Sequence, residues 1–407
     1  MNQQRTGFDP EGDEDDWTSA HPGRPPVLGA GLVFSPSGAE RESTAPADTD
    51  LDEVSTPTEI KQLDAVAEPV APGAVQSHWK QDPASPSGVG ARSGALVPTG
   101  DATPARWGWR NRVRQVSAGL IQPAPGTAER GHRDEIDTIR RTTWTRSMNV
   151  IVTNPKGGTG KTPAALILAG ILGRLRGGYV VVWEASEQVG TLGRRCEGDP
   201  QRGLAELLSD IAGIRSAGRL GGYTAPQTSH ADVIGSSGPR NTLSAPQMLS
   251  VREVLDTYYR ITVTDTGNNP GHETYRAALR IADAVLIPCL VSSDALAGVE
   301  QTLRLIESGS GAVNLRDRVV VVLGHDGGPE DPALCAAVQH RLSELSVAAV
   351  VEVPFDPVIR RGGEISLSAL SEESSRAWTR TGAAIVRALS AANTEIDLVA
   401  QVRAEIG

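Results

Sequence analysis

The fold is decided by residues 148–175, which read MNVIVTNPKGGTGKTPAALILAGILGRL. The first six of these residues form a short apolar run that is typical of a buried strand. From Pro163 to Leu175 the apolar residues recur with helical spacing. Three glycines lie between the two patterns and favour a tight turn. The stretch therefore predicts a strand, a glycine-rich turn and a helix in direct succession.

The turn has the composition of a loop that binds phosphate groups. Gly157, Gly158 and Gly160 let the main chain bend around an anion, so that N–H groups converge on its oxygen atoms. The following helix points its positive N-terminal end at the same place. Lys161 can reach the β- and γ-phosphates of a nucleotide, and Thr162 offers a hydroxyl to Mg²⁺. The alternative is a glycine-rich turn with incidental lysines, but the strand before and the helix after favour a nucleotide site.

The rest of the chain, up to about residue 389, alternates between apolar runs and helical periodicity. Continuous apolar strands that alternate with helices indicate a parallel sheet covered on both faces. We therefore predict an α/β fold with a doubly wound, mostly parallel sheet, as in P-loop NTPases. Further strands are expected at residues 179–184, 261–265, 284–289, 319–323 and 348–353, and one more at 231–234 inside a loop rich in Gly, Ser and Pro.

The first 105 residues differ in composition from the rest, because they are rich in Pro, Ser, Gly and acidic residues. Residues 1–70 contain 15 acidic and 4 basic residues, a net charge of −11, whereas the whole chain carries −10. The remainder is thus close to neutral. Such a segment cannot bury enough apolar surface to offset its chain entropy. We predict a disordered acidic tail whose charge argues against nucleic-acid binding by that segment.

Residues 106–147 form a segment of another kind, with nine arginines, four acidic residues and three tryptophans. Arginine together with tryptophan can indicate a nucleic-acid patch or a helix at a membrane surface. We favour a linker that docks its tryptophans onto the folded domain, because the patch is short and interrupted by prolines and acids. The expected division of the chain is a tail at 1–105, the Arg/Trp segment at 106–147, the P-loop domain at 148–392 and a C-terminal helix or tail at 393–407.

The spacing of the cysteines and the length of the apolar segments indicate the cellular compartment in which the protein is expected. Cys196, Cys289 and Cys335 are widely spaced and form no CxxC pair, which fits a reducing environment. Cys289 lies in an apolar run and is most simply a small buried side chain. Residues 1–17 lack the apolar centre of a signal peptide, and no stretch reaches the roughly 20 apolar residues that span a bilayer. We expect a cytoplasmic protein.

Residues 155–162, PKGGTGKT, resemble the deviant Walker A motif of the ParA/MinD family of P-loop ATPases. The resemblance extends over about residues 148–389, and the tail, the Arg/Trp segment and this domain together look like an actinobacterial member. It implies an ATP-dependent homodimer in which Lys156 reaches the nucleotide of the partner subunit, so that Lys156 and Lys161 both act in hydrolysis. The residues that it places around ATP are Lys156, Gly157, Gly158, Thr159, Gly160, Lys161, Thr162 and Pro163.

Residues 261–267, ITVTDTG, resemble the family's strand whose terminal aspartate holds Mg²⁺ through water. The resemblance makes Asp265 and Thr162 the expected metal ligands, although an aspartate after a strand can also be a helix cap. Residues 319–326 and 353–357 resemble the strand ends that enclose the adenine. Here His325 and its neighbours stand where the family often has Asn, so no adenine-reading residue is assigned.

Two departures from the family pattern bear on activity. Pro163 replaces a Thr or Ser, which removes a hydroxyl and an N–H near the α-phosphate; proline is tolerated in a first helical turn, so we expect an intact fold with weaker nucleotide binding. After the second strand, the family's D-x-D-type sequence is replaced by Glu184-Ala185-Ser186-Glu187. Ser186 cannot act as a base, so Glu187 is our candidate for positioning the attacking water in slow hydrolysis. The alternative is that Glu184 and Glu187 are solvated loop acids.

The resemblance implies a switch ATPase that dimerises on ATP and positions or partitions a cargo, such as a plasmid, a chromosome region or a division component. Two alternatives remain open: an accessory ATPase of a secretion or conjugation system, and a regulator that binds the nucleotide without hydrolysing it. A metabolic enzyme of the same fold would need a substrate pocket from the same loops, and no such constellation is visible.

The expected partners, besides a second copy, are an unidentified protein that activates hydrolysis and nonspecific DNA. DNA binding would need a local basic patch, for which the candidates are Arg194, Arg195, Arg202, Arg360 and Arg361. Peripheral membrane recruitment would call for a basic amphipathic terminal helix. Residues 394–407 carry three acids and one arginine and are better suited to a helix packed on protein.

Overall fold

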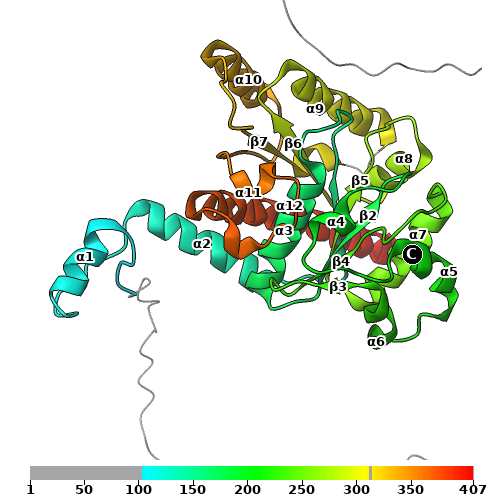
Figure 1. The fold of residues 1–407 in the computed structure, drawn as a ribbon, viewed down its shortest axis with the longest axis horizontal. Coiled ribbons are helices and arrows are strands. Elements are labelled where there is room, and N and C mark those ends of the chain that lie inside the picture. The colour runs from blue at the N-terminus through cyan, green and yellow to red at the C-terminus, as the bar shows by residue number, and fades with distance from the viewer. Residues whose placement is uncertain (1–102, 311–313, 407) are drawn as a thin grey trace, which may run out of the picture. The chain divides into compact units, whose positions relative to one another are not determined.

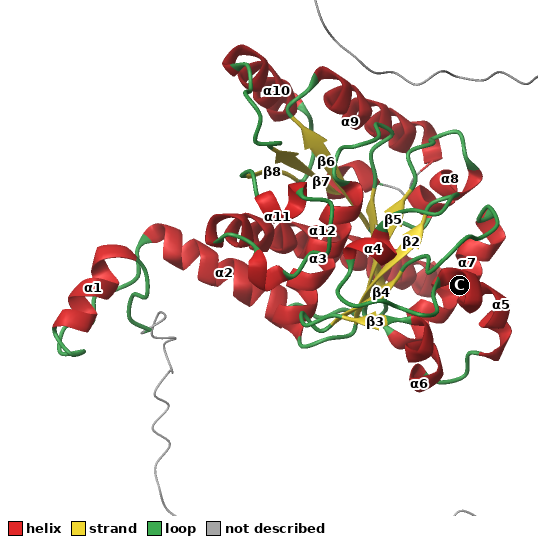
Figure 2. Ribbon diagram, in the orientation of Figure 1, coloured by secondary structure: helices red, strands yellow, loops and turns green. Residues whose placement is uncertain are grey.

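The computed structural model describes residues 103–310 and 314–406. The predicted acidic tail lies outside these residues, apart from its last three positions. The described chain forms one eight-stranded sheet between two layers of helices (Figure 1). Figure 2 shows the strands as a twisted central layer with helices on both sides. The predicted α/β fold class is confirmed.

The sheet has the strand order β3-β4-β2-β5-β1-β6-β7-β8, and every pairing is parallel except that of β3 with β4. The strand bounds are β1 Met148–Val152, β2 Val180–Ala185, β3 Ala225–Pro226, β4 Ala231–Ile234, β5 Ile261–Thr266, β6 Ala284–Leu290, β7 Val319–Gly324 and β8 Ala349–Val353. The predicted strands agree with these bounds to within one residue at each end. Two-residue β3, in the stretch predicted as loop, was missed, because a proline and a single apolar residue carry no strand signal.

The helices differ in length from single turns to a helix of 35 residues. Their bounds are α1 Gly108–Val116, α2 Thr127–Arg141, α3 Lys161–Arg176, α4 Leu192–Arg195, α5 Leu204–Asp210, α6 Ala217–Leu220, α7 Ala245–Tyr258, α8 Glu273–Arg280, α9 Ser293–Leu305, α10 Pro332–Glu344, α11 Pro357–Arg360 and α12 Glu372–Ile406. Helix α12 runs across the division expected at residue 393.

Alternate residues of the central strands serve two separate cores, because successive side chains of a strand point to opposite faces. Val150 and Val152 pack with α3, α12 and the end of α2. Ile151, Val181 and Trp183 pack on the other face with α5, α7, α8, α9 and α10. Strands that are buried on both faces need to be apolar throughout, which explains the continuous runs in the sequence.

Helix α3 lies in the middle of its layer, and its residues 164–173 are all buried. Its close approach to the sheet depends on Gly173, where a Cβ atom would stand 2.8 Å from the main-chain nitrogen of Ala231. The position of α3 relative to β4 is therefore set by backbone contact near the C-terminal end of the helix. The short loop after β1 places the N-terminal end of the helix at the edge of the sheet where the parallel strands end.

The Arg/Trp segment contains α1 and α2. Helix α2 contacts α12 and α3, and the guanidinium of Arg176 stacks on the Trp144 ring at 4.8 Å. Trp107 lies 5.2 Å from the guanidinium of Arg376, whereas Trp109 is 67% exposed. Two of the three tryptophans thus contact the folded domain. Among the helices of the described chain, none has the length and apolar character needed to cross a bilayer.

Candidate nucleotide site

The loop between β1 and α3 has the shape expected of an anion cradle. Gly158 and Gly160 have φ angles of +78° and +86°, in the region that glycine adopts without strain. These turns bring the chain from the end of β1 to the first turn of α3, which starts at Lys161. Thr159 is buried, and its hydroxyl donates to the carbonyl oxygen of Lys156 at 3.3 Å. The free N–H groups of a helix start thus face the same cavity as the loop.

Asn154 anchors the start of this loop, a role that sequence reasoning missed. Its amide nitrogen donates to the carbonyl oxygens of Pro288 at 2.8 Å and Ala295 at 3.3 Å. Its amide oxygen accepts from the main-chain nitrogen of Lys156 at 2.9 Å. A Cβ atom at Gly298 would stand 2.1 Å from that oxygen, so the α9 glycine makes room for the amide. The only sequence signal was a polar residue directly after a buried strand.

The two lysines of the loop have different surroundings. The ammonium of Lys161 donates to the carbonyl oxygen of Lys156 at 3.1 Å. Burial lowers the pKa of Lys161, while the carboxylates of Asp265 and Glu187 act to raise it. The ammonium of Lys156 instead pairs with Asp294 of α9 at 2.7 Å, and the Lys156 side chain is 47% exposed. Lys161 therefore faces the cradle, whereas Lys156 lies at the surface, where a second molecule can reach it.

Thr162 and Asp265, the predicted metal ligands, are in direct contact. Because Val152 of β1 pairs with Asp265 of β5 in the sheet, the end of β5 lies beside the loop. The Thr162 hydroxyl donates a hydrogen bond to the Asp265 carboxylate at 2.6 Å. The other carboxylate oxygen of Asp265 is buried without a hydrogen-bond partner in the described chain. Burial raises the pKa of Asp265 to about 7, and nearby Glu184 adds to this rise. A buried, unsatisfied carboxylate beside a hydroxyl fits a hard cation such as Mg²⁺.

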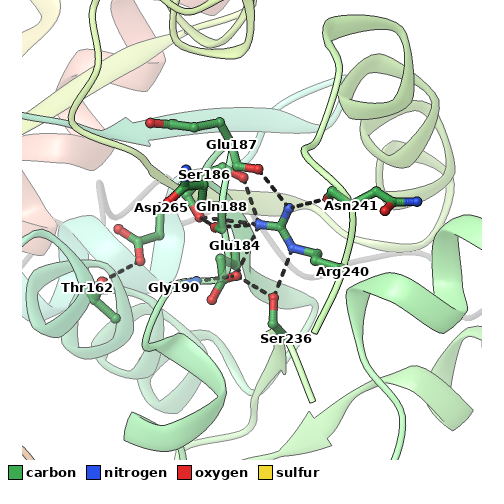
Figure 3. A network of polar contacts seen from close by, with 10 residues as sticks. All are labelled: Thr162, Glu184, Ser186, Glu187, Gln188, Gly190, Ser236, Arg240, Asn241 and Asp265. Carbon is green, nitrogen blue, oxygen red and sulfur yellow. Dashed lines mark hydrogen bonds and ion pairs between the residues drawn. The ribbon is translucent and has the colours of Figure 1, made fainter. Parts of the chain in front are cut away.

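Glu184 is not a solvated loop acid, because its side chain is 1% exposed. It accepts hydrogen bonds from the main-chain nitrogen of Gly190 at 2.9 Å and from the Ser236 hydroxyl at 2.5 Å. Its third partner is Arg240 at 3.3 Å, which is 2% exposed. Figure 3 shows these residues as one polar network beside Thr162 and Asp265. Neither Ser236 nor Arg240 was singled out from the sequence, since both lie in the Gly-, Ser- and Pro-rich stretch predicted as loop.

Glu187 lies on the phosphate-loop side of that network. In Figure 3 its carboxylate points away from Arg240, toward the side on which Asp265 lies. One carboxylate oxygen is buried without a hydrogen-bond partner within the described residues. The same oxygen would stand 2.0 Å from a Cβ atom at Gly267, and the charge of Glu187 acts on Lys161. Ser186 donates to the carbonyl oxygen of Gln188 at 2.5 Å, so its hydroxyl is used locally.

A cavity of about 650 Å³ opens beside the loop, within the size range of small-molecule sites. One wall is formed by residues 158–164, including Pro163, and the opposite wall by the ends of β6, β7 and β8.

His325, on the wall opposite the loop, contacts Glu330 at 2.8 Å and Glu352 at 2.9 Å. Burial lowers the pKa of His325, but the hydrogen bonds with the two glutamates outweigh it, so the pKa is raised. Both ring nitrogens are thus occupied and are not free to read a base.

The arginines considered for a DNA patch have various surroundings. Arg194, Arg195 and Arg360 line the cavity, and Arg195 donates to the carbonyl oxygen of Ile359 at 2.7 Å. Arg202 pairs with Asp210 at 2.8 Å. Three of the five therefore line the cavity beside the glycine loop. Cys289, as expected, is buried.

No family model matches the chain. The chain is 23% identical over 267 residues to the ESX-1 secretion-associated protein EspI of Mycobacterium tuberculosis, and the match covers 65% of this chain but only 39% of EspI.

Among solved structures, it is similar to a ParA family ATPase from Chlorobium tepidum, with 14% identity, a TM-score of 0.44, and coverage of 61% of this chain and 98% of that chain. It is also similar to the cell division ATPase MinD from Pyrococcus furiosus, with 17% identity, a TM-score of 0.43, and coverage of 59% and 99%.

Proposed function

We propose that this chain is an ATP-dependent switch of the ParA/MinD type, which binds ATP with Mg²⁺, forms a dimer in that state and hydrolyses ATP slowly. One observation carries the proposal: the glycine loop, Lys161 and Thr162 line one cavity, and Thr162 is hydrogen-bonded to Asp265 at the end of β5, the strand beside β1. Ligands of doubly wound sheets bind at that edge.

The residues divide the work as follows. Main-chain N–H groups of the loop and Lys161 hold the phosphate oxygens. Thr162 and Asp265 would hold Mg²⁺, which would neutralise phosphate charge when bound. Glu187 accepts a proton from, or orients, the attacking water. Lys156, which is exposed, extends to the nucleotide of the second copy and stabilises charge there, in the manner of an arginine finger.

The test uses the full chain with ATP and Mg²⁺, followed by calorimetry, sedimentation and phosphate release. Lys161→Ala is expected to abolish nucleotide binding. Lys156→Ala is expected to retain binding but to lose both dimerisation and hydrolysis. Lys80→Ala, far from the loop in sequence, is the matched control and should behave like the parent. If both loop variants bind ATP and assemble as the parent does, the assigned roles are wrong.

A second proposal concerns the system that the switch serves. The similarity to EspI, a secretion-associated protein, favours an accessory role in a secretion apparatus over cargo partition, with an unidentified protein partner that triggers hydrolysis. Partition instead requires ATP-dependent binding to nonspecific DNA that weakens steeply with salt. Fluorescence anisotropy with a random-sequence duplex, at low and at physiological salt, separates the two. Salt-sensitive binding that needs ATP and Lys161 would overturn the secretion proposal.

A further inference from the structure

We infer that Arg240 is a positioning residue for hydrolysis: it fixes the main chain of residues 186–188 so that the Glu187 carboxylate is held at the phosphate loop. The inference rests on the proposed function. Arg240 lies in a loop whose residues do not line the nucleotide cavity. Arg240 follows β4 in the chain and reaches the segment after β2 across more than fifty residues of sequence.

The Arg240 guanidinium donates to three successive carbonyl oxygens. One terminal nitrogen lies 2.7 Å from the carbonyl oxygens of both Ser186 and Gln188. The other lies 3.1 Å from the carbonyl oxygen of Glu187. That oxygen also accepts from the main-chain nitrogen of Leu243 at 3.0 Å. The planar fork of arginine suits such multiple contacts, whereas a lysine ammonium cannot reproduce them.

Contacts with Ser236 and Glu184 hold the Arg240 guanidinium in place. Its Nε donates to the Ser236 hydroxyl at 3.0 Å, and that hydroxyl donates to Glu184. Glu184 also pairs with Arg240 directly, and both side chains are almost fully buried. A buried ion pair contributes little net stability, because the cost of removing both charges from water offsets their attraction. The arrangement is therefore better explained by the geometry that it imposes than by its contribution to folding.

That geometry determines where Glu187 points. With its carbonyl group tied to Arg240 and Leu243, the Glu187 side chain leaves the main chain on the opposite side, as Figure 3 shows. Its carboxylate then lies against Gly267, and one of its oxygens is buried without a hydrogen-bond partner among the residues that the structure describes. The same carboxylate acts electrostatically on Lys161. A carboxylate with an unused acceptor, close to the phosphate-binding lysine, is placed to accept a hydrogen bond from water at the terminal phosphate.

The test compares Arg240→Lys with the parent in single-turnover phosphate release and in ATP titration. We expect the rate to fall about 10- to 100-fold, since misplacement by about 1 Å can cost a factor of 100. We expect the dissociation constant for ATP to change less than about threefold, because Arg240 does not line the cavity. In a Glu187→Gln background the same substitution should give no further loss, because residues that act as one unit are not additive.

Arg202→Lys is the matched control, since that arginine makes an ion pair with Asp210 away from the network; it should leave rate and affinity unchanged. If Arg240→Lys does not fold, the double variant Glu184→Met/Arg240→Met removes the buried charges together and takes its place, with the same expected rate loss.

A parental rate in either folded variant, or an equal loss in the Glu187→Gln background, would overturn the inference. Failure of the parent itself to bind ATP would instead refute the proposed function, and the two failures are thus distinguishable.

Discussion

The contact between Glu187 and Gly267 gives a sharp test of whether Glu187 takes part in hydrolysis. Substitution of Gly267 by alanine would place a Cβ atom 2.0 Å from a Glu187 carboxylate oxygen, and ordinary contact starts near 3.4 Å. The carboxylate must therefore move by about 1.4 Å. It is the far end of a flexible side chain, so this movement costs little folding energy, and Gly267→Ala should fold normally.

Displacement of that size is enough to impair a group that orients water. A misplacement of about 1 Å can reduce a rate about 100-fold, and general-base assistance contributes about 10²–10⁴-fold. We therefore expect Gly267→Ala to lower single-turnover phosphate release about 100-fold, with ATP affinity close to that of the parent. Quenched-flow measurement of phosphate release and calorimetry with ATP and Mg²⁺ would check both quantities.

A double-mutant cycle distinguishes this mechanism from a direct effect of alanine on the phosphates. If alanine acts only through Glu187, Gly267→Ala should cause no further loss in a Glu187→Ala background, because the two changes then remove the same interaction. Additive losses would refute the reasoning, since they would mean that residue 267 acts independently of Glu187. An unchanged rate in the single variant would show that the carboxylate is not needed where the structure places it.

Three further predictions concern stability, pH and assembly. Gly173→Ala should lower the free energy of unfolding by about 1–3 kcal/mol through overpacking. Gly218→Ala should not lower it, because its added Cβ has nothing within 4 Å. Equal midpoints of the two variants in urea denaturation would contradict the packing argument. Because the pKa of His325 is raised, its protonated form stabilises the fold below about pH 6.5, and this contribution is lost as pH rises through the folded-state pKa. His325→Gln should therefore lower the melting temperature more at about pH 6 than at about pH 9. An equal loss at both pH values would contradict this prediction. Asp294→Asn releases Lys156 from α9 and should strengthen the ATP-dependent dimer in sedimentation. The melting temperature should not change measurably, because exposed ion pairs contribute little to stability. A weaker dimer would mean that Asp294 supports assembly.

Strands buried on both faces were predictable because their apolar runs are continuous. The runs at 261–265 and 319–323 coincide almost completely with β5 and β7. The turn between β1 and α3 was predictable for a similar reason, because its glycines are adjacent in sequence and lie between an apolar run and a helical pattern. What escaped prediction depends on contacts between distant segments. Asn154 meets Pro288 across 134 residues and Arg240 meets Ser186 across 54, and neither carries a local pattern.

The two margins of the sheet bear on how copies of the chain can associate. At one margin β3 is only two residues long and contains Pro226, which has no N–H to offer another strand. At the other margin β8 presents exposed Glu352, bound to His325, and charge on a border strand discourages strand addition. Formation of one continuous sheet by two copies is thus disfavoured at both margins.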